Sequence, residues 1–346
     1  MFQIGYMKQK MRVLITGIGT VAAQGFVKGV RQQDEFKVYL VSTDAREDNA
    51  GRYFTDAFYK VPRGDDPAYV AEIIKVCKKE KIDLLFPGAD AEIMALSQHK
   101  ESIEKETGTR VAVSPFEGVK ICDDKYLAYT YFAKHHFKTV PTFLLEEAVE
   151  KVKAGRLAFP LFIKPRIGTG SKHTHVVQNL EELQEKASLV PIPIVQPYLG
   201  AWKEFSVDVA ADFNGKVLGV VPRTREEVRY GAAYRGVTVK DPLLISMAKE
   251  IVEHLGLIGP INVQIFKNLQ TGEALLFEIN PRIGATHAHT IASGLNTPHL
   301  MLKLFNGEQL EPRLGQFKDK LWMYRHWDEV YVEENGQRLP RNYRLL

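Results

Sequence analysis

Hydrophobic runs and amphipathic stretches alternate along the first third of the chain. The apolar run RVLITG is followed by a glycine turn and the amphipathic stretch IGTVAAQGFVKGVRQ, and the next apolar run is KVYLVST. The stretch AYVAEIIKVCKKEK then precedes IDLLFPG, and RVAVSP closes the pattern. Strands that alternate with helices are typical of a doubly wound parallel sheet. We therefore expect an α/β domain of this kind over residues 1–115.

The pattern changes in the second third of the chain. Helical patterns over 120–136 and 145–154 precede the strand FPLFIKP, and a β-rich stretch follows with the runs THVVQN, PIVQPY, EFSVDVAADF and KVLGVVPRT. The turn DFNGK carries an Asn-Gly hairpin signal. The helix DPLLISMAKEIVEHLG then precedes a second hairpin, INVQIFKNLQTGEALLFEIN, and a last helix, HTIASGLNTPHLMLKLFNGE. We expect an α+β domain over 116–310 and a tail over 311–346 with one more strand-like run.

Composition excludes several classes of function. The 346 residues are 45% hydrophobic and 25% charged, which is typical of a globular protein of two or three domains. The net charge is only +4 and no dense Lys/Arg tract occurs, so we expect no nucleic-acid partner. The apolar runs are short, the first residues lack a signal-peptide core, and Cys77 and Cys122 suit buried free thiols. We therefore expect a cytoplasmic protein without a membrane partner.

Polar side chains interrupt the strand that ends in FEINPRIG. Glu278, Asn280 and Arg282 are two residues apart, so they share one face if the strand continues. The turn NLQTGE brings Gln264 roughly opposite Glu278. Hard cations such as Mg²⁺ take oxygen ligands and share them with phosphates, while a guanidinium binds a phosphate directly. The alternative is an edge-strand Glu–Arg ion pair beside a turn-forming Asn-Pro.

Two further segments suit a nucleotide. In FIKPRIGTGSKH, Lys164 ends a strand and a loop with Gly168, Gly170 and Ser171 follows, whose backbone N–H groups can approach phosphate oxygens. The spacing of a Walker A motif is absent, and a flexible hairpin tip is the alternative. In IVQPYLGAWKEFSVDV, an extended segment can bind a planar base and Glu204 can accept ribose hydroxyls, with a surface acid as the alternative.

Taken in order, these segments resemble the ATP-grasp superfamily, and most closely its carboxylate–amine ligases of the carbamoyl-phosphate-synthase large-subunit type. The matching pieces are DDKYLAY, FIKPRIGTGSK, IVQPYLGAWKEFSVDV, VVPRTREEVRYG, INVQIF and FEINPRIGATHAHTIASGLN. The first domain is similar to the pre-ATP-grasp domain of that family through GIGTVAAQG, VSTDARED and FPGADAEIMAL. The resemblance implies an ATP-grasp domain with a small subdomain over about 120–195 and a large one over about 196–310.

The resemblance also assigns a role to individual residues. Lys125 and Lys164 would contact the ATP phosphates, and Ser171 with the backbone of Gly168–Gly170 would form a mobile lid over them. The segment beside adenine would comprise Gln196, Pro197, Tyr198 and Leu199, with backbone contacts from Tyr198 and Leu199, and Glu204 would hold the ribose. One or two Mg²⁺ ions, or Mn²⁺ as a substitute, would bind to Gln264, Glu278 and Asn280.

The remaining roles concern the reacting groups. Arg282 would face the γ-phosphate, and Arg223 and Arg225 would bind an acidic substrate; a charged, solvent-facing connector is the alternative for these two. We expect Arg282, Lys164 and Arg223 to be catalytic in a ligase that uses ATP to activate a carboxylate as an acyl phosphate for attack by an amine. Both substrates would be small molecules, and a homodimer is one assembly that the sequence leaves open.

Four features depart from the family pattern or leave other interpretations open. Lys172 stands where arginine is usual in this family, and Ala285 and His287 replace a more common double glycine. His287 and His289 could form a transition-metal pair, although oxygen ligands nearby favour Mg²⁺. The turn with Gly17, Gly19 and Ala22, followed by Asp44, approximates a dinucleotide fingerprint, so an NAD(P)-dependent oxidoreductase stays open, as does a non-catalytic nucleotide-binding subunit.

Overall fold

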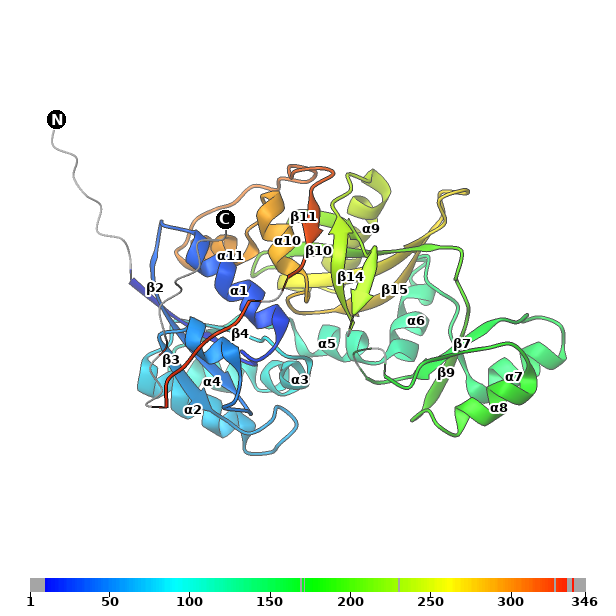
Figure 1. Ribbon diagram of the computed structural model, residues 1–346, viewed down its shortest axis with the longest axis horizontal. Coiled ribbons are helices and arrows are strands. Elements are labelled where there is room, and N and C mark those ends of the chain that lie inside the picture. Colours follow the sequence, from blue (N-terminus) through cyan, green and yellow to red (C-terminus); the bar gives the residue numbers. More distant parts are fainter. Residues whose placement is uncertain are drawn as a thin grey trace.

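The first described part of the chain contains a five-stranded parallel sheet (Figure 1). The computed structural model describes residues 10–168, 170, 172–229, 231–326, 328–334 and 338. Across the first sheet the strands are β3 (Ala57–Lys60), β2 (Lys37–Asp44), β1 (Lys10–Ile15), β4 (Leu84–Phe86) and β5 (Arg110–Val111). Its helices are α1 (Val21–Gln32), the 3-10 helix η1 (Ala50–Phe54), α2 (Tyr69–Glu80), α3 (Asp90–Gln98) and α4 (Lys100–Thr107).

Helices cover both faces of this sheet because its strands are apolar on both sides. Val13 and Ile15 of β1 join a core with Phe26 of α1, whereas Leu14 between them joins a core with Ile73 of α2. Continuous hydrophobic strands are typical of parallel sheets buried on both faces. The doubly wound arrangement expected from the sequence is confirmed.

A helical segment connects the first sheet to the rest of the molecule. The expected single helix over 120–136 is wrong, because α5 (Phe116–Asp123) and α6 (Lys125–Lys134) are separated at Asp124. The Asp124 carboxylate accepts hydrogen bonds from the N–H groups of Tyr126 and Leu127, so it caps a new helix.

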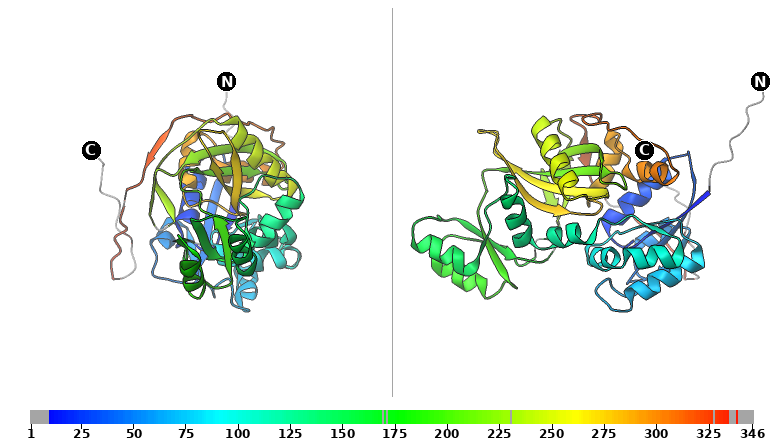
Figure 2. Two further views of the ribbon diagram at one scale, coloured as in Figure 1. Left: turned by 90° about the vertical axis from the view of Figure 1, so that its right-hand side faces the viewer. Right: turned by 180° about the vertical axis from the view of Figure 1, so that it is seen from behind.

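A small antiparallel sheet forms a lobe that projects from the molecule (Figure 2). Its strands, in order, are β6 (Phe143–Leu144), β9 (Pro193–Pro197), β7 (Leu161–Pro165) and β8 (His175–Val177). Two helices pack on it with a core of their own, α7 (Leu145–Lys153) and α8 (Leu180–Ala187). The pattern within the β-rich stretch did not reveal α8.

The large antiparallel sheet has one apolar and one polar face. Its strands, in order, are β11 (Val217–Thr224), β10 (Lys203–Ala211), β14 (Gly259–Lys267) and β15 (Ala274–Asn280). On β10, Phe205 and Val207 pack in a core with residues of α9 (Pro242–His254). Glu204 and Ser206 alternate with them and therefore face the opposite side. The fold thus directs the polar residues of these strands away from α9.

The last helical segment and the tail complete the described chain. The expected last helix is broken at Gly294 into α10 (His287–Ser293) and α11 (Thr297–Phe305). A three-stranded sheet of β12 (Glu227–Arg229), β13 (Ala232–Val237) and β16 (Trp322–Tyr324) follows, so the tail contributes a strand to a sheet that the sequence did not reveal.

The N-terminal sheet shares a hydrophobic core with α11 and with the segment that follows β15. Phe26 and Val27 of α1 belong to the same cluster as Ile283, Met301 and Leu302. Cys77 and Cys122 are buried free thiols, as expected. Within the described ranges no helix is long and apolar enough to cross a membrane. The predicted domain boundaries at 115, 195 and 310 stay predictions.

Candidate active site

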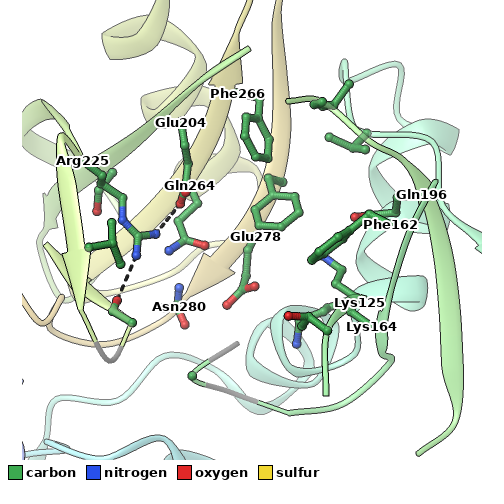
Figure 3. Close-up of a pocket in the computed structure, with 18 of the residues that line it drawn as sticks. Lys125, Phe162, Lys164, Gln196, Glu204, Arg225, Gln264, Phe266, Glu278 and Asn280 are labelled. Carbon is green, nitrogen blue, oxygen red and sulfur yellow. Dashed lines mark hydrogen bonds and ion pairs between the residues drawn. The ribbon is translucent and has the colours of Figure 1, made fainter. Parts of the chain in front are cut away.

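A cavity of about 670 Å³ lies between the small lobe and the polar face of the large sheet. Strands β7 and β9 line one side of the cavity, and β10, β14 and β15 line the other (Figure 3). Asp90 of α3 and Lys125 of α6 also contribute to the wall. Cavities of this size hold nucleotide-sized ligands. The fold therefore brings most of the candidate residues to one place.

The candidate metal ligands form two neighbouring rows on the polar face. Gln264 and Glu278 are direct cross-strand partners, as the turn between them predicts, and Asn262 pairs with Asn280 in the next row. Figure 3 shows Gln264, Glu278 and Asn280 at the edge of the same open space. Their oxygen atoms are the ligand type that Mg²⁺ prefers. Only one of the three is a carboxylate, and the described part of the chain holds no group of three or more His, Cys, Asp or Glu residues suited to a metal.

Arg282 is held by a residue of the N-terminal sheet. Its Nε lies 2.7 Å and its Nη2 3.2 Å from the two carboxylate oxygens of Asp90. Its Nη2 also donates to Oδ1 of Asn280 at 3.0 Å, so the guanidinium links α3 to the candidate metal ligands. The alternative of an ion pair between Glu278 and Arg282 is wrong, because Asp90 takes that place. Asp90 is 192 residues from Arg282, and no sequence pattern pointed to it.

Lys164 is a buried cation without a hydrogen-bond partner. Its Nζ lies 3.7 Å from the centroid of the Phe277 ring, and no hydrogen-bond acceptor reaches it within the described residues. Burial lowers the pKa of Lys164 to about 7, against an opposing effect of the Glu278 charge. A buried polar group is normally paired, so the site suits an anionic ligand that supplies the missing partner.

Lys125 contacts the glycine loop. It is the first residue of α6, and its Nζ donates to the carbonyl oxygen of Gly168 at 2.7 Å. Gly168 and Gly170 line the cavity and have positive φ angles of 146° and 72°, which explains the glycines. Ser171, expected in the lid, lies outside the described residues.

The segment expected beside adenine lies at and just after the C-terminal end of β9. Gln196 is buried, and its side-chain amide donates to Oγ1 of Thr142 at 2.8 Å. The Tyr198 N–H donates to the Pro160 carbonyl at 3.1 Å, so a backbone contact between Tyr198 and a base would use the Tyr198 carbonyl oxygen. The Pro197 carbonyl belongs to the same trans peptide and therefore points the opposite way. Pro197 and Leu199 both line the cavity.

Glu204 and Arg225 form an ion pair in the cavity wall (Figure 3). Arg225 also donates from Nη2 to the carbonyl of Gly231 at 2.9 Å. Burial raises the pKa of Glu204, while the charge of Arg225 opposes this effect. The position of Glu204 at the rim is compatible with the expected ribose contact, and Arg225 lies directly beside it.

Arg223 does not line the cavity, contrary to the expectation of direct substrate contact. Its side chain is fully buried and donates from Nη2 to Oδ2 of Asp208 at 2.8 Å. Burial alone would raise the pKa of Asp208, but the charge of Arg223, the neighbouring His287 and a hydrogen bond from Thr290 hold it well below its usual range. The solvent-facing connector is equally wrong for Arg223. In the sequence, the signal for this buried pair was Asp208, an acid in the middle of the apolar run FSVDVAADF.

His287 and His289 do not converge on a shared site. His289 donates from Nε2 to the Leu321 carbonyl at 2.8 Å, whereas Nδ1 of His287 lies 3.4 Å from Asp208. Among the described residues, neither histidine belongs to a group of three or more His, Cys, Asp or Glu that could hold a metal ion. The glycine turn of the first sheet also has an internal partner, because the Gly19 N–H donates to Asp44 at 2.7 Å. A carboxylate thus occupies a donor that a dinucleotide phosphate would need.

Comparisons with known proteins agree with this geometry. Residues 190–322 match the family "ATP-grasp in the biosynthetic pathway with Ter operon", and residues 13–112 match the family "PylC-like, N-terminal domain". The chain therefore contains an ATP-grasp domain. Its curated relatives include carbamoyl phosphate synthase large chains, so the resemblance in the sequence motifs is confirmed.

The relatives are distant and longer than this chain. The large chain from Thermotoga petrophila is 21% identical over 306 residues, covering 80% of this chain and 27% of the relative. The one from Pyrobaculum aerophilum is 22% identical over 333 residues, covering 88% and 32%. The chain therefore spans about a quarter to a third of the length of these relatives.

Solved structures show the same fold at low sequence identity. N5-carboxyaminoimidazole synthetase from Staphylococcus aureus, complexed with ADP, has a TM-score of 0.70 at 17% identity over 88% of this chain and 80% of its own. The biotin carboxylase domain of 2-oxoglutarate carboxylase from Hydrogenobacter thermophilus, with MgADP, ADP and bicarbonate, has a TM-score of 0.70 at 16% identity over 96% and 83%.

Proposed function

We propose that the protein is an ATP- and Mg²⁺-dependent ligase that activates a carboxylate for attack by an amine. The observation that carries this proposal is the position of Lys164, a buried cation without a partner, across one cavity from the oxygen ligands of Gln264, Glu278 and Asn280 (Figure 3). Phosphoryl transfer needs cations and metal ligands placed around a phosphate chain more than it needs covalent help from the protein.

The residues around the cavity divide into three groups by their chemistry. The base would lie against the C-terminal end of β9, where the Pro197 carbonyl offers an acceptor, and the ribose would lie near Glu204. The phosphates would contact Lys125 and Lys164. Bound Mg²⁺ would be held by Gln264, Glu278 and Asn280, and it would neutralise phosphate charge.

The proposed reaction has two steps. A carboxylate oxygen attacks the γ-phosphorus of ATP, the bond to the β-phosphate oxygen breaks, and ADP leaves with an acyl phosphate formed. The amine nitrogen then attacks the acyl carbon, inorganic phosphate leaves, and the nitrogen loses a proton to give the amide. Arg282, beside the metal ligands, would stabilise charge on the transferring phosphoryl group.

The distant relatives support the class of reaction and leave the substrates open. Carbamoyl phosphate synthase, N5-carboxyaminoimidazole synthetase and biotin carboxylase are the named relatives and neighbours, and two of the neighbouring structures hold ADP. Because the chain spans a third or less of the synthase large chains, we do not extend their complete reaction to it. A dimer, as in the biotin carboxylase domain structure, is one assembly compatible with this proposal.

An ADP-release screen over pairs of carboxylates and amines tests the proposal. ADP and phosphate should form with at least one pair and only with Mg²⁺ or Mn²⁺ present. Glu278→Ala should abolish this turnover because it removes the single charged metal ligand, whereas Glu185→Ala, a change at an exposed acid of α8, should leave it unchanged. Turnover of Glu278→Ala at the wild-type rate would refute the metal assignment.

A nicotinamide assay separates the remaining alternatives. Reduction of NAD(P)⁺ without ADP release would favour the oxidoreductase. Tight Mg·ATP binding without any product would favour a non-catalytic nucleotide-binding protein. The hydrogen bond from the Gly19 N–H to Asp44 makes reduction of NAD(P)⁺ the less expected result.

A further inference from the structure

Arg223 connects the buried interior to two residues of the cavity wall. Its Nη1 donates to Oγ1 of Thr286 at 2.8 Å, and its Nη2 donates to Oγ of Ser206 at 3.4 Å. Ser206 and Thr286 both line the cavity although each is 95% buried by exposed area. A guanidinium has only donors, so each hydroxyl oxygen in contact with it must accept.

The direction of these bonds fixes the direction of the hydroxyl protons. Ser206 accepts a second hydrogen bond from Nδ2 of Asn262 at 2.8 Å, so both of its lone pairs are used and its O–H proton can only be donated. Within the part of the chain that the structure describes, no acceptor for the Ser206 proton or the Thr286 proton lies within hydrogen-bond distance. Thr290 differs, since it accepts from Arg223 and donates to Asp208 and is therefore satisfied internally.

The sheet register places one of these donors beside the candidate metal ligands. Arg223 pairs with Ser206, Ser206 with Gln264, and Gln264 with Glu278, so the four residues form one row across β11, β10, β14 and β15. Directly paired residues of antiparallel strands lie on the same face. The Ser206 hydroxyl therefore lies next to Gln264, on the side of the ligand set away from Glu278.

We propose that Ser206 and Thr286 bind the carboxylate of the substrate that is to be phosphorylated, with Arg223 as a positioning residue. This inference rests on the proposed function and names its carboxylate site. A carboxylate accepts hydrogen bonds only, so it matches two donors whose protons have no other partner. An ammonium group would leave both protons unpaired, and leaving a buried donor unpaired is unfavourable. The ion pair of Arg223 with Asp208 holds the hydroxyls in a fixed orientation without contributing a net charge.

Titration of the Mg·ADP-loaded protein with trifluoroacetate, followed by ¹⁹F NMR, tests the inference with a simple carboxylate. Ser206→Ala and Thr286→Val should each raise the Kd for trifluoroacetate by about three- to tenfold, the loss of one hydrogen bond. Thr286→Ser keeps the hydroxyl and should bind as the wild type does. Ser97→Ala removes a buried hydroxyl that does not line the cavity and donates to the Ser114 carbonyl, and it should also have no effect.

Calorimetry with Mg·ADP on the same proteins separates the two proposals. If the wild type does not bind Mg·ADP, the proposed function fails, and this inference fails with it. If it binds Mg·ADP but not trifluoroacetate, or if Ser206→Ala and Thr286→Val bind trifluoroacetate normally, the carboxylate site alone is refuted. Ser206→Ala, the smaller change, decides the matter if Thr286→Val loses Mg·ADP binding. Arg223→Lys should weaken trifluoroacetate binding at unchanged Mg·ADP affinity, which a merely structural role would not produce.

Discussion

At the scale of single residues, the Lys164 ammonium determines how the cavity responds to pH. It is buried against Phe277, and its pKa is lowered to about 7 because burial disfavours the charged form. A phosphate placed beside it would favour the charged form again. Nucleotide binding should therefore be coupled to protonation of this one side chain.

We predict that a non-hydrolysable Mg·ATP analogue binds with uptake of a proton above pH 7. At pH 8 a group with a pKa of about 7 is mostly neutral, so binding should take up about 0.9 proton, and affinity should fall up to tenfold per pH unit above 7. Below pH 7 the lysine is already charged and its contribution to affinity is complete. Calorimetry in buffers of different ionisation enthalpy measures the uptake.

Lys164→Met provides the comparison for this prediction. It keeps the apolar stem and removes the titrating group, so the difference from wild type excludes protons exchanged by the nucleotide itself. The variant should bind more weakly at pH 7 and lose the extra proton uptake. Equal uptake by both proteins at pH 8 would show that Lys164 is not the group involved.

Strand alternation predicts which residues share a face, but not which hydrogen bonds they make. The pairing of Gln264 with Glu278 follows from the turn between them and is confirmed. The expectation that Arg223 contacts the substrate directly is wrong because its partner, Asp208, is defined by tertiary packing. Spacing within a strand carries no information about such contacts.

At the scale of elements, the contact of α3 with the end of β15 matters most for the site. Asp90, the first residue of α3, holds Arg282 by two hydrogen bonds. Two parallel bonds to a carboxylate fix the plane of a guanidinium as well as its position. The first domain therefore orients a side chain that we expect to face the γ-phosphate.

We predict that Asp90→Asn lowers kcat for ADP release by about tenfold, because Arg282 loses its charged partner and its fixed orientation. The Kd for Mg·ADP should change by no more than about twofold, since the phosphates left on ADP are served by the lysines. Steady-state kinetics with the substrate pair found by the screen measures the first effect, and calorimetry measures the second.

Asp65→Asn is the matched control for Asp90→Asn. It removes the same charge from an ion pair with Arg63 on the same domain, but both side chains there are largely exposed. Exposed pairs contribute little, so this variant should match the wild type. A wild-type kcat for Asp90→Asn would mean that Asp90 does not orient Arg282.

The sequence pattern predicts the type of most elements but misplaces some of their ends. Continuous apolar runs identify the strands of the first sheet, and the Asn-Gly turn identifies the β10–β11 hairpin. The breaks at Asp124 and Gly294 escape it because the hydrophobic pattern continues through both positions. A capping aspartate or a glycine ends a helix through local hydrogen bonds and a left-handed backbone, which hydrophobic spacing does not record.

At the scale of the whole molecule, helix α1 joins the two larger parts of the chain. It packs against α10 and α11, which the views from both sides show (Figures 1 and 2). The approach is close at Gly29, where a Cβ atom would lie 2.8 Å from Ile291 Cδ1 and Pro298 Cγ and 2.9 Å from Asn296 Oδ1. Asn296 also donates to the Gly29 carbonyl at 2.9 Å. A small residue is therefore required at this contact.

We predict that Gly29→Val lowers the free energy of unfolding of both parts together, by about 2–3 kcal/mol, because the added side chain overpacks the contact. In a Trp327→Phe background the remaining tryptophans, Trp202 just before β10 and Trp322 in β16, lie outside the N-terminal sheet, so tryptophan fluorescence reports on the rest of the chain. Because one core spans both parts, the midpoints of urea unfolding followed by fluorescence and by far-UV circular dichroism should fall together.

Lys28→Ala, on the exposed face of α1, should leave both midpoints unchanged. A fall in the dichroism midpoint alone would mean that the first domain unfolds independently, and that Asp90 reaches Arg282 across a contact less stable than the shared core implies.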